Sequence, residues 1–297
     1  MKFKPKISTI VITSIVVTSA VAGGLAIGII LGKALSPKAP IAPAGKIDTG
    51  LEDDYAALLK RHEENPSVDQ FRPYELANIS WLKFGQLEDS YSVSIGEVEA
   101  AIVKQKIFAV DVRNGDKFFT ESLSYSGIKK CGSRFYQDSS SVQEYTASGI
   151  KENGTATWNE NTLVTNSLEG HEENWGKTLD RPVIYNISEK TVLKEELLEE
   201  NGKYIVNLEL DPILSVQRYI RQMAMISSLD RYPEFKYVKL KFTFDKELNI
   251  EELTSDESYV VYVVGKNESH GVLTQKFHRE GGKTILGLTD NFDYKEF

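Results

Sequence analysis

The longest apolar run of the chain covers residues 7–32, which contain no charged side chain and no His, Asn or Gln. At about 1.5 Å of rise per residue, a helix over this range is roughly 39 Å long, enough to cross a hydrocarbon layer of about 30 Å. We therefore expect a transmembrane helix at residues 7–32. The alternative is a removable signal peptide, because residues 20–22 read Ala-Val-Ala after a basic start and an apolar stretch.

The charges before this run predict its orientation. Lys2, Lys4 and Lys6 precede it, and no acidic residue occurs before Asp48. By the positive-inside rule, residues 1–6 stay in the cytoplasm and the rest of the chain lies outside the plasma membrane. The predicted location is thus a single-pass plasma-membrane protein.

Residues 33–49 contain prolines at positions 37, 40 and 43, a spacing that favours an extended stalk. We expect this stalk to connect the membrane to one extracytoplasmic domain over residues 50–297.

Helical spacing of apolar residues appears in three stretches of that domain. The first covers residues 51–62, and the second begins at Pro73, a favourable first helical position. The third follows Asp211 and Pro212, which combine an N-cap side chain with a ring that fixes the first helical φ.

Strict apolar and polar alternation dominates the remaining sequence and predicts strands. The clearest example is the run through Val238, Leu240, Phe242 and Phe244. Asn-Gly pairs at 114–115, 153–154 and 201–202 predict tight hairpin turns. Residues 169–180 read as a polar loop, and residues 183–185 and 285–288 read as short strands.

Together these patterns predict an α+β fold. We expect a curved antiparallel sheet, an incomplete barrel, packed on a few helices and preceded by one transmembrane helix.

The charge balance narrows the partners of the domain. The chain has 35 basic and 43 acidic residues, with a formal charge of −8. Nucleic acids and anionic lipid headgroups bind basic clusters, so we expect no nucleic-acid partner. Cys131 is the single cysteine, which excludes an internal disulfide.

A search for catalytic or cofactor motifs favours a protein that is not an enzyme. Gly-Lys-Thr occurs at 176–178 and 282–284, but neither has the first glycine of a phosphate-binding loop, so we expect no nucleotide. The four histidines have no helical pair spacing for zinc, and no nucleophile elbow occurs. We expect no catalytic residues, no metal and no cofactor.

Aromatic and branched side chains concentrate in the predicted strands. They either fill a closed core or line a gap between the sheet and the helices, where an acyl chain would fit. For the second case, the predicted ligand-binding residues are Phe108, Val110, Tyr204, Val206, Phe242, Phe244 and Tyr259.

The order of elements resembles the lipoprotein-carrier fold of the LolA and LppX kind. The resemblance covers residues 53–277: an early helix, long strands, the segment Leu-Glu-Leu-Asp-Pro at 208–212 leading into an inward helix, and three further strands. It implies an incomplete barrel wrapped around helices, with a cavity for lipid. No short motif specific to that group occurs, so no functional position is transferred.

The expected function is non-enzymatic binding of a hydrophobic ligand, a lipid or a lipidated peptide, by a domain held at the membrane through residues 7–32. The alternative is a cell-envelope scaffold or receptor that binds protein or wall polymer through its surface and has no ligand cavity. An apolar cavity of a few hundred Å³ separates these two hypotheses.

Overall fold

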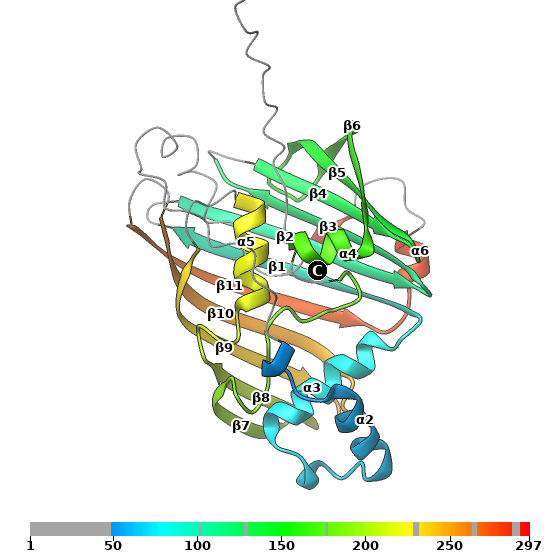
Figure 1. Cartoon of the computed structure of the whole chain (residues 1–297), viewed down its shortest axis with the longest axis vertical. Coiled ribbons are helices and arrows are strands. Elements are labelled where there is room, and N and C mark those ends of the chain that lie inside the picture. The colour runs from blue at the N-terminus through cyan, green and yellow to red at the C-terminus, as the bar shows by residue number, and fades with distance from the viewer. Residues whose placement is uncertain are drawn as a thin grey trace, which may run out of the picture.

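One antiparallel sheet of eleven strands organises the molecule, in the order β6-β5-β4-β3-β2-β1-β11-β10-β9-β8-β7 (Figure 1). The computed structural model describes residues 49–100, 103–127, 130–175, 178–227, 232–262, 266–286 and 292–297. The strands are β1 (Asp89–Ala100), β2 (Val103–Asn114), β3 (Lys117–Tyr125), β4 (Lys130–Gln137), β5 (Ser141–Ile150), β6 (Ala156–Ser167), β7 (Val192–Glu200), β8 (Lys203–Leu210), β9 (Glu234–Phe244), β10 (Ile250–Tyr262) and β11 (Lys266–His278).

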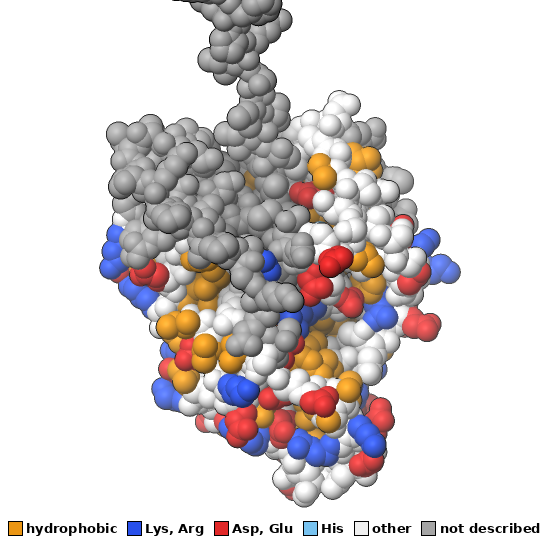
Figure 2. Space-filling view, in the orientation of Figure 1, with side chains coloured by type: hydrophobic (Ala, Val, Ile, Leu, Met, Phe, Trp, Pro, Cys, Tyr) orange, Lys and Arg blue, Asp and Glu red, His pale blue; other side chains and the backbone are white. Residues whose placement is uncertain are grey.

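The helices are few and short. They are η2 (Thr49–Leu51), α2 (Tyr55–Glu64), η3 (Val68–Gln70), α3 (Pro73–Gly85), α4 (Leu168–Trp175), α5 (Gln217–Ser227), α6 (Gly282–Leu286) and η4 (Tyr294–Glu296). Helices α3, α4 and α5 lie in front of the sheet as it is viewed in Figure 1. Acidic and basic side chains are interspersed over the end of the molecule formed by α2, α3, β7 and β8 (Figure 2).

The sheet consists of two meanders that run in opposite directions from a shared centre. Strands β1 to β6 follow one another outward to one edge, and β11 back to β7 lead to the other. The meanders join where β1 pairs with β11, with Ser94 opposite Gln275. This junction connects segments that are about 180 residues apart along the chain, so no local sequence pattern specifies it.

Each strand presents alternate side chains to two faces, and both faces are partly covered. We call the interior face the one that carries Ser94, Gln275, Leu253 and Phe242, which are neighbours or cross-strand partners. The opposite face is the outer face.

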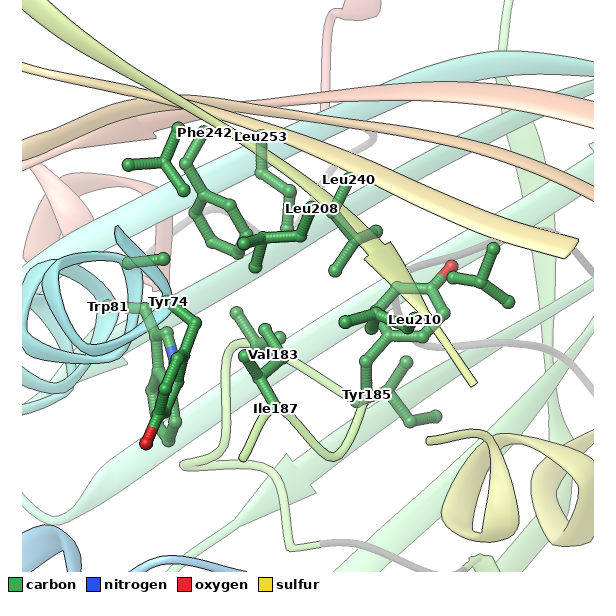
Figure 3. Close-up of a cluster of buried hydrophobic side chains, with 14 of the residues drawn as sticks. Tyr74, Trp81, Val183, Tyr185, Ile187, Leu208, Leu210, Leu240, Phe242 and Leu253 are labelled. Atoms are coloured by element: carbon green, nitrogen blue, oxygen red, sulfur yellow. The ribbon is translucent and has the colours of Figure 1, made fainter. Parts of the chain in front are cut away.

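The apolar core lies on the interior face of β8 to β10. Phe242 pairs with Val206 and Leu253 on the neighbouring strands, and all three are buried. Side chains of α3 and of residues 183–187 pack onto them (Figure 3). The Asn78 side chain secures this cover by donating a 2.9 Å hydrogen bond to the Ile187 carbonyl.

A second apolar cluster lies on the outer face of β1 to β5. It contains Phe108 and Val110 together with Tyr294 from the last residues of the chain. The Tyr294 hydroxyl donates to the buried Glu121 at 3.1 Å, and Glu121 pairs with Arg134 at 2.7 Å. The segment 292–297 therefore covers part of the outer face.

The antiparallel sheet and its hairpins confirm the strand predictions. The predicted turns at 114–115, 153–154 and 201–202 each join two consecutive strands. The helix predicted directly after Pro212 differs, because residues 212–216 form turns and α5 begins at Gln217.

Three short segments also differ from the prediction. Residues 169–180 contain helix α4, residues 183–185 form no strand, and α6 occupies the place of the strand predicted at 285–288. In these stretches the contacts with the sheet, rather than the local residue pattern, select the conformation.

The predicted fold class, an α+β domain preceded by a spanning helix, was wrong. One antiparallel sheet of eleven strands dominates the described chain. Period-two alternation continues beyond the strands rich in aromatic residues into strands whose alternate positions are serine or charged. In the described ranges, no helix is long and apolar enough to cross a membrane. Residues 7–32, on which the spanning helix was predicted, lie outside the described residues. The cellular location stays a prediction.

Candidate functional site

The structure brings five of the seven predicted ligand-binding residues together. Tyr204, Val206, Phe242, Phe244 and Tyr259 lie on β8, β9 and β10 and belong to the apolar cluster of the interior face. The other two, Phe108 and Val110, lie in the separate outer-face cluster. The seven residues therefore do not line one common space.

The five grouped side chains are closely packed. Four of them are buried, and Tyr204 is half-buried with its ring 6.1 Å from that of Phe244. A cavity of about 10 Å³ lies beside this cluster, between residues 182–185 and strands β10 and β11. This is close to the volume that one water requires. Direct contact of these side chains with a ligand stays a prediction.

A row of small and polar side chains crosses the interior face next to the apolar core. Its members are successive cross-strand partners from β11 through β1, β2, β3 and β4 to β5, and all are buried: Gln275, Ser94, Ala109, Ser122, Ser133 and Thr146. We call this set the serine row. Buried strands usually carry large branched or aromatic side chains at such positions, so the serine row is unusual in placing small and polar groups inside the molecule.

Three hydroxyls of the serine row lack a hydrogen-bond partner within the described chain. They belong to Ser94, Ser122 and Ser133, which are at most 1% exposed. An unsatisfied buried hydroxyl costs about 1–3 kcal/mol. Buried polar groups in native proteins normally have partners, and three of the exceptions among the described residues lie in this one cross-strand row.

Several polar residues that flank the serine row have partners, whereas the Ser255 and Ser269 hydroxyls, which also lie on the interior face, have none within the described chain. The Gln275 amide donates to the Ser92 hydroxyl at 2.8 Å, and Thr120 donates to Asp111 at 2.9 Å. The Gln105 amide also bonds the Ser124 hydroxyl. The interior face therefore contains closed hydrogen-bonded pairs around an open set of hydroxyls.

Aromatic and aliphatic side chains border the serine row. On one side of the row, Leu273 lies two residues from Gln275 and Ile107 two residues from Ala109. On the other side, Phe277 lies two residues from Gln275 and Phe135 two residues from Ser133. The Phe135 ring contacts His171 on α4, with ring centroids 5.4 Å apart. The site thus combines a polar strip with apolar borders.

A cavity of about 30 Å³ opens at one end of this face. Its lining includes Ser92, Asp111 and Arg113 from the sheet, and Leu179 and Pro182 from the segment that crosses over it. A space of this size holds about one water. A larger guest therefore requires the covering segment to move.

A separate buried carboxyl group lies on the interior face of β10, four residues along the strand from Leu253, the cross-strand partner of Gln275. Glu257 on β10 accepts hydrogen bonds from Tyr185 at 2.8 Å and from Tyr219 at 2.7 Å. Burial raises the pKa of Glu257 to about 8, although the two tyrosine hydrogen bonds oppose that rise. The Tyr259 hydroxyl, two residues along the same strand, lacks a partner within the described chain.

The tyrosines around Glu257 are also electrostatically perturbed. Burial, and then the negative charge of Glu257, holds the pKa of Tyr185, Tyr219 and Tyr259 well above the ordinary value. These phenols stay protonated and act as hydrogen-bond donors. Since Tyr185 and Tyr219 come from different covering segments, one carboxyl group ties both to the sheet.

The outer face carries a wider groove of about 530 Å³ across β7 to β10. Its side chains alternate in charge along one cross-strand row, from Lys194 through Glu209 and Lys239 to Asp256. Lys194 and Glu209 form an ion pair at 2.7 Å. Asp256 also bonds the His270 ring at 2.9 Å. These groups largely satisfy one another, so the groove offers no concentrated charge to a partner.

Metal-binding clusters do not occur among the residues that the structure describes: no three His, Cys, Asp or Glu side chains there could share an ion.

Comparisons with known proteins give only distant structural similarities. No protein-family model matches the chain, and no curated protein sequence matches it. A DUF1329 family protein from Desulfovibrio piger is structurally similar, with 10% identity, a TM-score of 0.26, and coverage of 69% of this chain and 90% of that chain.

Two further solved structures are similar at the same level. The S-type phycobiliprotein lyase CPES from Guillardia theta shows 7% identity and a TM-score of 0.23, covering 68% of this chain and 94% of its own. An N-terminal dehydratase from the difficidin assembly line shows 10% identity and a TM-score of 0.16, covering 72% and 84%. Similarities this weak identify neither a ligand nor an activity, and the LolA and LppX resemblance is not specifically confirmed.

The sequence analysis missed the serine row and Glu257. A signal was present, because serines alternate with apolar residues at positions 90, 92 and 94 and again at 122, 124 and 126. That pattern is normally interpreted as polar side chains facing solvent. Here the serines are buried on the interior face, and the alternating apolar residues belong to the outer-face cluster.

Proposed function

We propose that this protein binds a small amphipathic molecule on the interior face of its sheet, without making or breaking covalent bonds. The serine row faces the polar part of the ligand, and the bordering aromatic and aliphatic side chains face its apolar part. One observation carries this proposal: three buried hydroxyls of one cross-strand row have no partner within the described chain.

A purely structural role explains the serine row poorly. Larger apolar side chains at these positions bury more surface and leave no polar group unsatisfied, so they stabilise a core better than serine does. Retaining several buried serines together is understandable if the hydroxyls bond a guest. This proposal modifies the expected ligand from wholly hydrophobic to amphipathic.

Ligand entry requires a movable cover. The cavities at residues 179–185 have volumes of about 30 and 10 Å³, so a molecule larger than water must displace this segment. The segment makes few regular backbone hydrogen bonds, because it contains neither helix nor strand from 178 to 191. Residues 183–185 are buried in the apolar core and Tyr185 is hydrogen-bonded to Glu257, so opening this segment has to break these contacts.

Native mass spectrometry of the full chain, purified from its own host, tests the proposal. We expect a copurifying small molecule that organic extraction removes. Substituting Ser94, Ser122 and Ser133 together by Ala removes the hydroxyls without adding volume at these buried positions, and we expect this variant to be recovered without the molecule.

The matched control replaces outer-face threonines by Val at Thr243, Thr254 and Thr274, which leaves the interior face unchanged. We expect this control to keep its ligand. The proposal is contradicted if folded wild type never copurifies with a small molecule, or if the serine-row variant retains as much of it as wild type. Either result favours the surface-binding scaffold or receptor instead.

A further inference from the structure

Glu144 on β5 is a buried carboxyl group at the β5 end of the serine row. Only 6% of this residue is exposed, and no hydrogen bond or ion pair joins its side chain to another described residue. Its cross-strand partners are Phe135 on β4 and Val164 on β6, neither of which provides a polar side chain. Burial alone raises the pKa of Glu144 to about 7.

The groups closest in register to Glu144 belong to the serine row. Thr146 is two residues along the same strand and therefore shares the face, and Thr146 pairs with Ser133 across the strands. Diagonal neighbours in such a ladder are about 7–8 Å apart. The Ser133 hydroxyl, which has no partner within the described chain, and the Glu144 carboxyl group thus border the same small region.

No basic side chain compensates Glu144 within the described residues. The buried Arg134 belongs to the neighbouring strand but lies on the outer face, where it pairs with Glu121. An ionised carboxylate without a partner is unstable in a low-dielectric interior, and a cation brought by a ligand relieves that cost.

We propose that Glu144 binds a protonated amino group of the ligand, with the Ser133 hydroxyl as a second hydrogen-bond acceptor. This inference rests on the proposed function and narrows it to amphipathic amines. An ammonium group has three N–H donors, which suits one carboxylate and one hydroxyl oxygen. A carboxylate or phosphate head group is disfavoured at the same place because it has the same charge as Glu144.

Three probes with the same alkyl chain test this specificity: dodecylamine, dodecanol and dodecanoate. Binding of each to the full chain is measured by calorimetry at pH 8, below the concentration at which the probe aggregates. We expect wild type to bind the amine about tenfold or more tightly than the carboxylate.

Glu144→Gln keeps the side-chain shape and removes the charge. We expect it to weaken amine binding about tenfold while leaving dodecanol binding unchanged. Glu97→Gln is the control, because Glu97 is an exposed glutamate on β1. Circular dichroism and thermal melts verify that both variants fold.

The inference is overturned if Glu144→Gln keeps the preference for the amine, if wild type binds dodecanoate as tightly as the amine, or if none of the probes binds. The proposed function is assessed separately by the serine-row variant and native mass spectrometry. A ligand that depends on the serine row but not on Glu144 therefore refutes this inference alone.

Discussion

The hydroxyl of Tyr219 on α5 donates a 2.7 Å hydrogen bond to Glu257 on β10, so a covering helix is joined to the sheet through a buried carboxyl group. The same carboxyl group accepts from Tyr185 in the segment between α4 and β7. The two tyrosine rings also contact each other edge to face, with centroids 5.8 Å apart. Glu257 therefore holds both parts of the cover at one point.

This arrangement predicts a pH-dependent stability. The folded-state pKa of Glu257 is raised to about 8 from an ordinary value of 4.5, so the folded protein retains a proton that the unfolded chain releases. The stabilisation is complete below about pH 4.5 and is lost as the pH rises through about 8. We expect the free energy of unfolding of wild type to fall between pH 6 and 9.

Glu257→Gln removes this titration while preserving the shape of the side chain. Since each pKa unit corresponds to about 1.4 kcal/mol, we expect the stability advantage of wild type over the variant to decrease by a few kcal/mol between pH 6 and 9. Urea unfolding of wild type and Glu257→Gln at pH 6 and at pH 9 measures this difference in the free energy of unfolding. A constant difference across that range contradicts the role assigned to Glu257.

Phe242 is predicted to stabilise the core. Phe242→Ala removes a fully buried ring from the cluster in Figure 3, and we expect a loss of about 3–5 kcal/mol in the free energy of unfolding. Thr243→Ala changes the next residue, which faces the other side of the sheet, and we expect a loss below about 1 kcal/mol. Similar losses for both variants are incompatible with the assigned faces.

The Glu121–Arg134 pair under Tyr294 is predicted to be sensitive to removal of one partner. Both side chains are buried and 2.7 Å apart. Arg134→Met leaves the Glu121 carboxylate without its cation, and we expect a loss of about 3–5 kcal/mol. Adding Glu121→Met to this variant removes the stranded charge, so chemical denaturation of the double variant is expected to show a smaller loss than the single one.

Gly96 on β1 is predicted to be required where the two meanders join. A Cβ atom there would lie 2.4 Å from the Val272 carbonyl oxygen and 2.8 Å from the Leu273 Cα, both on β11. We expect Gly96→Ala to lower the thermal midpoint by separating these strands. Gly149→Ala is the comparison, because no atom lies within 4 Å of its added Cβ. The prediction fails if the two alanine variants melt at the same temperature.

Local sequence patterns predicted the hairpins well. Asn201 and Gly202 adopt positive φ angles of 52° and 78° between β7 and β8, as an Asn-Gly turn requires. Early helix α3 was likewise predictable, because Pro73 occupies its first turn and Glu75 accepts a hydrogen bond from the Arg72 amide at 2.8 Å. These features depend on residues that are close together along the chain.

The candidate site was much less predictable. Alternation correctly predicted that Val206, Phe242 and Tyr259 lie on strands, and the structure places them in one cluster. The same reasoning assigned Phe108 and Val110 to the same predicted site, although they lie on the other face of the sheet. Alternation defines two sets of side chains on a strand and does not say which set faces the helices. On β1 and β3 the serine set faces inward.

The sequence by itself determined most of the strands, their Asn-Gly turns and the scarcity of familiar catalytic motifs, because these depend on residue types at short spacing. Only the tertiary structure decided that β1 pairs with β11, that both faces of the sheet are covered, and that Ser94, Ser122 and Ser133 form one buried row. The physical reason is that burial and cross-strand neighbours are set by contacts between distant segments, and the free energy of those contacts overrides the usual preference of serine for solvent.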